Sequence, residues 1–136
     1  MGSKLLSLTA QASSRLPAPL VVLDTHAWVW WLTKPDRLGK AARRSIQKAS
    51  RIGVPAICPW EIATKAEAGG LRFDRPYELW IDQALTSDRR VELLPLSPQV
   101  AMTAAKLSWV HGDPADRMIV ATARVYDVSL VTSDER

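Results

Sequence analysis

The stretch LVVLDTH at residues 20–26 decides the fold, because it changes from wholly apolar to polar within one step. Its first four residues have the continuous apolar character of a strand that is buried on both faces of a parallel sheet. Asp24 ends that run, and a helical pattern follows over 26–33 until Pro35. A buried strand that passes directly into a helix predicts the first half of a strand–helix–strand unit.

The same alternation continues along the chain, with helical sequence between successive strands. We expect strands at 53–57, 91–94 and 128–131, and helices at 38–50, 60–68, 76–85, 97–107 and 113–126. This order predicts an α/β fold, a three-layer α/β/α sandwich with a central, mostly parallel sheet. Residues 20–136 are expected to form one domain, and residues 1–19 a flexible N-terminal arm.

Composition agrees with a globular domain and excludes several classes of protein. Hydrophobic residues make up 47% of the 136 residues and charged residues 24%, and no apolar run approaches the roughly 20 residues of a membrane span. Cys58 is the only cysteine, which excludes an intrachain disulfide and a thiolate metal cluster and fits a cytoplasmic protein. We expect this cysteine to be a packed apolar residue.

The net charge of +4 is compatible with a phosphate-rich partner. If four of the 14 acidic residues share one pocket, 18 basic residues stand against 10 acidic ones in the rest of the chain. A polyanion could then approach a negative pocket across a positive surface. Charge alone does not specify the partner, because many small basic proteins bind no nucleic acid.

Four acidic residues have positions that suit a catalytic or metal-binding site: Asp24, Glu61, Asp116 and Asp134. Asp24 and Asp134 each follow a predicted strand, and ligands bind beyond the carboxyl ends of parallel strands. Glu61 and Asp116 each come two residues after a proline that suits the first helical position, which predicts both acids in a first turn. Alternatives stay open: an N-cap for Asp24, an interaction with the helix dipole for the first-turn acids, and an exposed loop for Asp134.

Local interactions are also expected around these acids. Glu61 can pair with Lys65 one helical turn later. Asp113 can cap the helix that Pro114 begins, with Asp116 at its third position. If the four candidate acids instead meet in space, their mutual repulsion calls for a cation, and oxygen ligands suit Mg²⁺ or Mn²⁺.

Four motifs, taken in order, resemble those of the PIN-domain ribonucleases, and among these the VapC-type toxins of toxin–antitoxin pairs. The motifs are LDTH at 23–26, WEIA at 60–63, DPADR at 113–117 followed by IVATA at 119–123, and VTSD at 131–134. The resemblance covers nearly all of the chain from about residue 20, and its specificity lies in the ordered set. It implies a three-layer α/β/α sandwich and cleavage of RNA by a Mg²⁺- or Mn²⁺-dependent endonuclease.

The resemblance also implies roles for individual residues. Asp24 and Asp116 would be the main metal ligands. Glu61 would orient or deprotonate the attacking water, and Asp134 would complete the metal site, through a water molecule. Thr25, Asp113 and Thr132 would hold the metal ligands in place by hydrogen bonds. His26 and Arg117 would contact the substrate.

Partners follow from the resemblance as well. We expect a cognate antitoxin protein that covers a hydrophobic groove, RNA as the substrate, and a homodimer in the cytoplasm. Relatives continue past the last acidic motif into a helical turn and an edge strand, whereas this sequence ends at Arg136. The domain is therefore expected to lack that last edge strand.

A phosphatase and a non-catalytic binding module are the two alternatives to a ribonuclease. A phosphatase of the haloacid dehalogenase type needs a second aspartate two residues after Asp24, where this chain has His26, and the phosphate-binding loop of nucleotide hydrolases is absent. A catalytically silent PIN-like module that binds RNA or a partner protein remains the alternative.

Hydrophobic positions complete the expectations. Trp28 and Trp31 share a helical face and are expected in the core, whereas Trp30 points elsewhere and is expected to be exposed. Trp60 is expected in the core or in a pocket wall. Leu79, Ile81 and Leu85 are expected in the core, and Trp80 and Trp109 are expected to pack.

Overall fold

The computed structural model describes residues 19–107 and 113–133, which form a sheet of four parallel strands with helices on both faces. The strands are β1 (Leu20–Leu23), β2 (Arg51–Pro55), β3 (Val91–Leu94) and β4 (Ser129–Val131). The helices are α1 (Thr25–Thr33), the short 3-10 helix η3 (Pro35–Arg37), α2 (Lys40–Lys48), α3 (Ile57–Glu67), α4 (Tyr77–Thr86), α5 (Pro98–Lys106) and α6 (Pro114–Tyr126). The predicted α/β/α fold is confirmed.

The strand order β3-β2-β1-β4 places the first strand inside the sheet. The chain passes from β1 to β2 and then to β3 in one direction, and it returns across the sheet to add β4 on the other side of β1. In parallel sheets, ligands bind at the carboxyl ends of the strands where the order reverses in this way. For this fold, that place is the end of β1 and β4.

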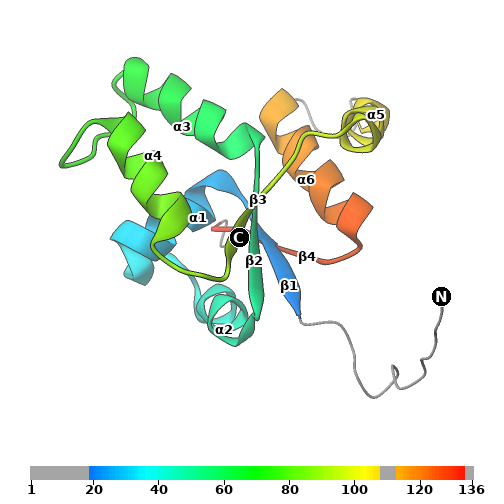
Figure 1. Cartoon of the computed structure of the whole chain (residues 1–136), viewed down its shortest axis with the longest axis horizontal. Helices are drawn as coiled ribbons and strands as arrows, with labels where there is room; N and C mark the ends of the chain where they lie inside the picture. The colour runs from blue at the N-terminus through cyan, green and yellow to red at the C-terminus, as the bar shows by residue number, and fades with distance from the viewer. Residues whose placement is uncertain (1–18, 108–112, 134–136) are drawn as a thin grey trace.

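Helices cover both faces of the sheet, which is seen nearly edge-on at the centre of Figure 1. On the face of α5 and α6, Val22 packs with Leu94 and Ala123. On the other face, Leu23 and Ile52 belong to the main buried cluster with residues of α1 to α4. Successive side chains of β1 therefore enter different cores, which explains why its sequence is apolar without interruption.

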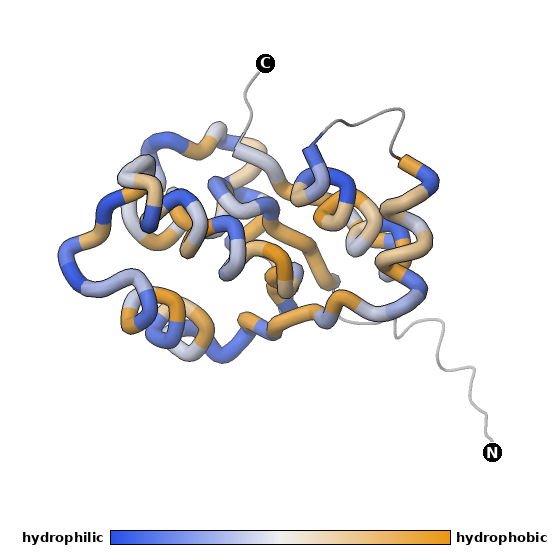
Figure 2. The backbone as a smooth tube through the Cα atoms, turned by 90° about the horizontal axis from the view of Figure 1, so that it is seen from above, coloured by the Kyte–Doolittle hydropathy of each residue, from blue (hydrophilic) through white to orange (hydrophobic). Residues whose placement is uncertain are grey.

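Hydropathy follows this layered arrangement. In Figure 2 hydrophobic backbone runs through the middle of the molecule, and many hydrophilic segments lie in the peripheral loops and at helix ends. Trp28 is fully buried, as predicted. Trp30 was expected to be exposed, but it is partly buried, and the Arg37 guanidinium lies 4.5 Å from its ring centroid. Within the described residues, no helix is long and apolar enough to cross a membrane.

Helix α3 begins earlier than its sequence predicts. It starts at Ile57, so Pro59 is its third residue and Glu61 its fifth. A proline is tolerated throughout a first turn, because the N–H groups there have no partner within the helix. The prediction that Glu61 lies in the first turn, close to the positive end of the helix dipole, is therefore wrong.

Helix α4 packs Ile81 and Leu85 against the main buried cluster, as predicted. Its buried residues are Trp80 and Ala84, whereas Leu79 is 46% exposed. Phe73, from the loop before the helix, stacks on the Trp80 ring at 4.5 Å between centroids. Trp80 is therefore packed in the core, as predicted, and only the prediction for Leu79 is wrong. Trp109 lies outside the described residues.

Candidate functional site

Three helices begin at the carboxyl end of the sheet, near β1. Helices α1 and α3 each start one residue after a strand, and α6 returns to β4, so it also starts at this end. Figure 1 shows the first turns of α3 and α6 near each other, and the two helices are in contact. Helix N-termini carry partial positive charge and unpaired N–H groups. This end of the sheet therefore suits acidic side chains and anionic ligands.

Asp24 joins β1 to α1 at this place. Its Oδ1 accepts a hydrogen bond of 2.8 Å from the backbone N–H of Ala27, so it is the N-cap of α1. Its own backbone N–H donates to the carbonyl of Val131, at 3.0 Å, and ties it to the end of β4. The expected N-cap is confirmed. Because the cap uses one of the two carboxylate oxygens, it is compatible with a second role as a ligand.

Glu61 is the buried acid of the site, with 9% of its surface exposed. Its Oε1 accepts a hydrogen bond of 2.5 Å from Oγ1 of Thr25, which is itself 2% exposed. Its Oε2 lies 3.6 Å from Nζ of Lys65, the partner expected one helical turn later. The carboxylate of Glu61 is therefore oriented by a hydrogen bond from α1 and has a positive charge near its other oxygen.

Cys58 is buried in α3, three residues before Glu61. Its pKa rises to about 12, chiefly because the thiol is buried, while a hydrogen bond with Thr25 acts against the rise. The negative charges of Glu61 and then Asp24 add smaller contributions to the rise of this pKa. A thiol with this pKa stays protonated at neutral pH, which confirms the packed apolar role and excludes a thiolate nucleophile.

Asp116 is carried to the same end of the sheet by α6. It is the third residue of that helix, in its first turn, as predicted. Ile119 lies one turn further on the same face and belongs to the buried cluster that contains Cys58 and Ile62 of α3. Helices α3 and α6 are in contact and their first turns lie near each other in Figure 1, so Asp116 lies in the turn of α6 that faces this end of α3. The carboxylate of Asp113 accepts a hydrogen bond of 2.9 Å from Ala115 N–H, which confirms it as the N-cap of α6.

The remaining predicted residues surround this group. Thr132 directly follows β4, the strand that bonds to Asp24. His26 lies in α1 with its ring centroid 6.0 Å from that of Trp30. Arg117 follows Asp116 in α6 and is partly buried. Asp134 lies outside the described residues.

The donor types of the site suit a hard divalent cation. The candidate ligands are carboxylates with hydroxyl groups beside them, and oxygen ligands of this kind select Mg²⁺ or Mn²⁺ over softer metals. Over residues 19–107 and 113–133, no three acidic, histidine or cysteine side chains are grouped closely enough to hold an ion. A complete ligand set would need Asp134 or a movement of the acids toward the metal.

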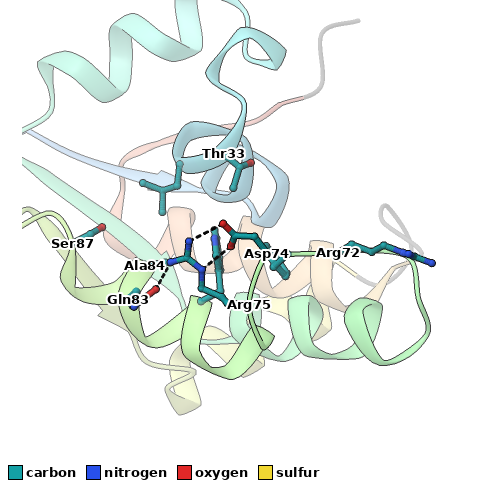
Figure 3. Close-up of a pocket in the computed structure, with 10 residues that line it drawn as sticks. Thr33, Arg72, Asp74, Arg75, Gln83, Ala84 and Ser87 are labelled. Carbon is teal, nitrogen blue, oxygen red and sulfur yellow. Dashed lines mark hydrogen bonds and ion pairs between the residues drawn. The ribbon is translucent and has the colours of Figure 1, made fainter.

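A cavity lies elsewhere, at the C-terminal end of α1. It has a volume of about 610 Å³ and is lined by Thr33, the loop before α4 and one side of α4. Figure 3 shows Arg75 pointing to Asp74 and Gln83 within it. These groups satisfy the guanidinium at 2.7 Å and 2.5 Å, so the cavity contains a neutralised pair and none of the candidate acids.

One feature of the site was missed from the sequence. Cys58 and Glu61 are three residues apart in a helix and therefore share a face, so their proximity could have been deduced once α3 was taken to begin before Pro59. Trp60 was expected in the core or a pocket wall, but it is 58% exposed.

Comparison with known proteins agrees with the fold and with the order of the motifs. Residues 21–136 match the family model of the PIN domain. The chain is 39% identical over 117 residues to "Ribonuclease VapC22" of Mycobacterium tuberculosis (strain ATCC 25618 / H37Rv), a match that covers 85% of this chain and 88% of that relative.

Solved structures share the architecture at much lower sequence identity. VapBC2 from Rickettsia felis, bound to a DNA fragment from its promoter, aligns with a TM-score of 0.58 and 15% identity over 82% of this chain and 85% of that one. A toxin–antitoxin complex from Klebsiella pneumoniae aligns with a TM-score of 0.54 and 15% identity over 81% and 82%. The chain belongs to the PIN-domain family, in which the VapC ribonuclease is its relative.

Proposed function

We propose that this chain is an endoribonuclease that requires Mg²⁺ or Mn²⁺ and acts as the toxin of a toxin–antitoxin pair. The observation that carries the proposal is the buried hydrogen bond of 2.5 Å from Oγ1 of Thr25 to Oε1 of Glu61, which ties Glu61 to the residue after Asp24 at the end of the sheet where α6 also begins. The name of the relative, a ribonuclease, supports RNA as the substrate. We assign the activity to residues 20–136 and regard residues 1–19 as an arm outside the catalytic domain.

Each acid has a part in the proposed reaction. Asp24 and Asp116, at the ends of α1 and α6, would hold the metal. The bound ion would supply a water of lowered pKa and stabilise charge on the phosphate. Glu61, oriented by Thr25, would accept or hold the proton of the attacking water. Asp134 is proposed to complete the site.

Other groups would bind the substrate. Three helix N-termini and an excess of basic residues favour the approach of a phosphate chain. His26 and Arg117 are proposed to contact it, since both adjoin a candidate ligand in the sequence. The exposed indole of Trp60, next to Glu61 in the sequence, offers a surface on which an RNA base can stack.

A cognate antitoxin is the proposed protein partner. The solved structures that share this fold include one described as a toxin–antitoxin complex and another described as VapBC2 on promoter DNA. We extend the same arrangement to this chain, together with a homodimer and a cytoplasmic location. Co-expression with the protein encoded beside it, followed by purification of a stable complex, tests this part of the proposal.

A catalytically silent binding module is the second candidate. It is favoured by one observation, that no group of three metal-binding side chains is assembled within the described residues. Such a module would bind RNA or a protein but would leave RNA uncut in the presence of either metal.

Metal-dependent cleavage separates these two functions. Purified protein is expected to cut RNA when Mg²⁺ or Mn²⁺ is added and to stop when a chelator is added. Asp116→Asn is expected to lower the cleavage rate at least ~100-fold with an unchanged circular dichroism spectrum, since it removes a metal ligand from an exposed position. The rate is followed by gel electrophoresis of a labelled RNA.

A matched control is Asp82→Asn, which removes one negative charge from an exposed position on α4. It should cut at the wild-type rate, because α4 does not contribute to the site. Equal activity of wild type and Asp116→Asn, or cleavage that persists in chelator, would contradict the proposed mechanism.

A further inference from the structure

Lys65 is a basic side chain whose ammonium lies beside a candidate catalytic acid. Its Nζ is 3.6 Å from Oε2 of Glu61, and its side chain is 38% exposed while that of Glu61 is 11% exposed. The pair therefore joins a buried carboxylate to a cation that reaches solvent.

The geometry of this pair differs from that of the other ion pairs. Arg51 with Glu92, Arg75 with Asp74, and Arg90 with Asp88 are joined at 2.7 Å to 2.8 Å, which are hydrogen-bond distances. At 3.6 Å the Lys65 ammonium is near Glu61 without a full hydrogen bond. Because the acid's other oxygen is held by Thr25, the lysine is not needed to orient it.

The pair has a structural role in stabilising the helix. A glutamate and a lysine four residues apart stabilise a helix by about 0.2–0.5 kcal/mol. That value applies to exposed pairs. Here the acid is mostly buried, so the pair is screened less and the ammonium also offsets part of the cost of burying the charge of Glu61. A half-exposed cation at the edge of an acidic site has a second use, since it can attract and hold an anion there.

We propose that Lys65 binds a phosphate of the RNA at the edge of the carboxylate site, where Glu61 keeps its ammonium in place. This inference rests on the proposed ribonuclease function and adds a residue that binds the substrate. The flexible stem and compact charge of lysine suit a contact with one phosphate oxygen rather than with a planar pair of acceptors. The contact would also offset repulsion between the phosphate and the acids.

RNA binding measured without cleavage tests the proposal. The parent is Asp116→Asn, and the probe is a short fluorescein-labelled single-stranded RNA, titrated in Mg²⁺ with fluorescence anisotropy as the readout. Adding Lys65→Met should weaken binding on the order of 10-fold and make the slope of log K against log salt shallower by about 0.7, the value for one lost phosphate contact. Lys65→Arg should keep the wild-type slope, because the positive charge remains.

Lys48→Met is the matched control. Lys48 is exposed and ends α2, just before β2 begins, so it lies at the opposite end of the sheet from the site. The Lys48→Met substitution removes the same charge and should change neither the affinity for RNA nor the slope of log K against log salt. If Lys65→Met and Lys48→Met give the same affinity and slope, the phosphate contact does not exist.

Binding of Mn²⁺ without RNA separates a direct phosphate contact from an effect of Lys65 on the metal site. Mn²⁺ binding to the Lys65→Met protein, measured by calorimetry without RNA, should be no weaker than in the wild type, since removing a cation cannot repel the metal. Weaker Mn²⁺ binding would mean that Lys65 acts through the metal site, which would overturn a direct phosphate contact.

Failure of the proposed function gives a different pattern. If the parent binds too weakly to measure, the same variants are compared by their KM for RNA cleavage in the wild-type background, where only Lys65→Met should raise it. Wild-type protein that cuts RNA while Lys65→Met keeps its KM overturns the role of Lys65 alone. Wild-type protein that neither cuts nor binds RNA overturns the proposed function, and with it the role of Lys65.

Discussion

The hydrogen bond from Thr25 to Glu61 is the clearest example of how single residues build this site. Both side chains are buried, and they come from helices that follow different strands. A buried carboxylate that loses a donor keeps its desolvation cost without the compensating bond. The position of Glu61 therefore depends on the hydroxyl of a residue far away in the chain.

Thr25→Val should lower stability by about 1–3 kcal/mol, because it removes that hydroxyl and keeps the shape and branching of the side chain. The free energy of unfolding in urea measures the loss. Thr64→Val in α3 is the control, since its hydroxyl bonds to the Trp60 carbonyl in an exposed part of the helix. Equal effects of the two substitutions would mean that the Glu61 carboxylate does not depend on Thr25.

Among the elements, α6 has a favourable start and an unfavourable end. Asp113 caps its N-terminus, whereas Asp127 forms its C-cap with φ of 55°, in the left-handed region. A side chain with a Cβ is disfavoured there, and a negative charge at a helix C-terminus is also unfavourable. The helix that carries Asp116 is thus less stable than its length suggests.

Asp127→Gly is expected to stabilise the protein by about 0.5–1 kcal/mol and to raise Tm by a few degrees, because glycine adopts the left-handed conformation without strain. Differential scanning calorimetry measures the change. Asp127→Asn removes only the charge, so it should give a smaller rise, and Asp127→Val should lower Tm. A lower Tm for the glycine variant would show that the left-handed cap is not strained.

At the scale of the whole molecule, the topology of the sheet assembles the site. β1 lies between β2 and β4, and the chain reverses direction beside it, so the ends of β1 and β4 meet although they are far apart in the sequence. This order of strands brings to one end of the sheet the elements that carry Asp24, Glu61 and Asp116.

Much of this arrangement could be predicted from the sequence. The apolar run before Asp24, the cap at Asp113 and the alternation of strands and helices have local causes, so they could be read from neighbouring residues. The start of α3 and the exposure of Trp60 and Leu79 could not, because they depend on contacts between distant segments. The metal ligation and the place of Asp134 remain predictions.

Diffraction from crystals soaked in Mn²⁺, recorded with anomalous scattering, tests the central claim most directly. The account predicts a Mn²⁺ peak in contact with carboxylate oxygens of Asp24 and Asp116, near Glu61, at the carboxyl end of β1. Crystals with Mn²⁺ elsewhere, or with these carboxylates too far apart to contact one ion or an adjacent pair, would contradict it.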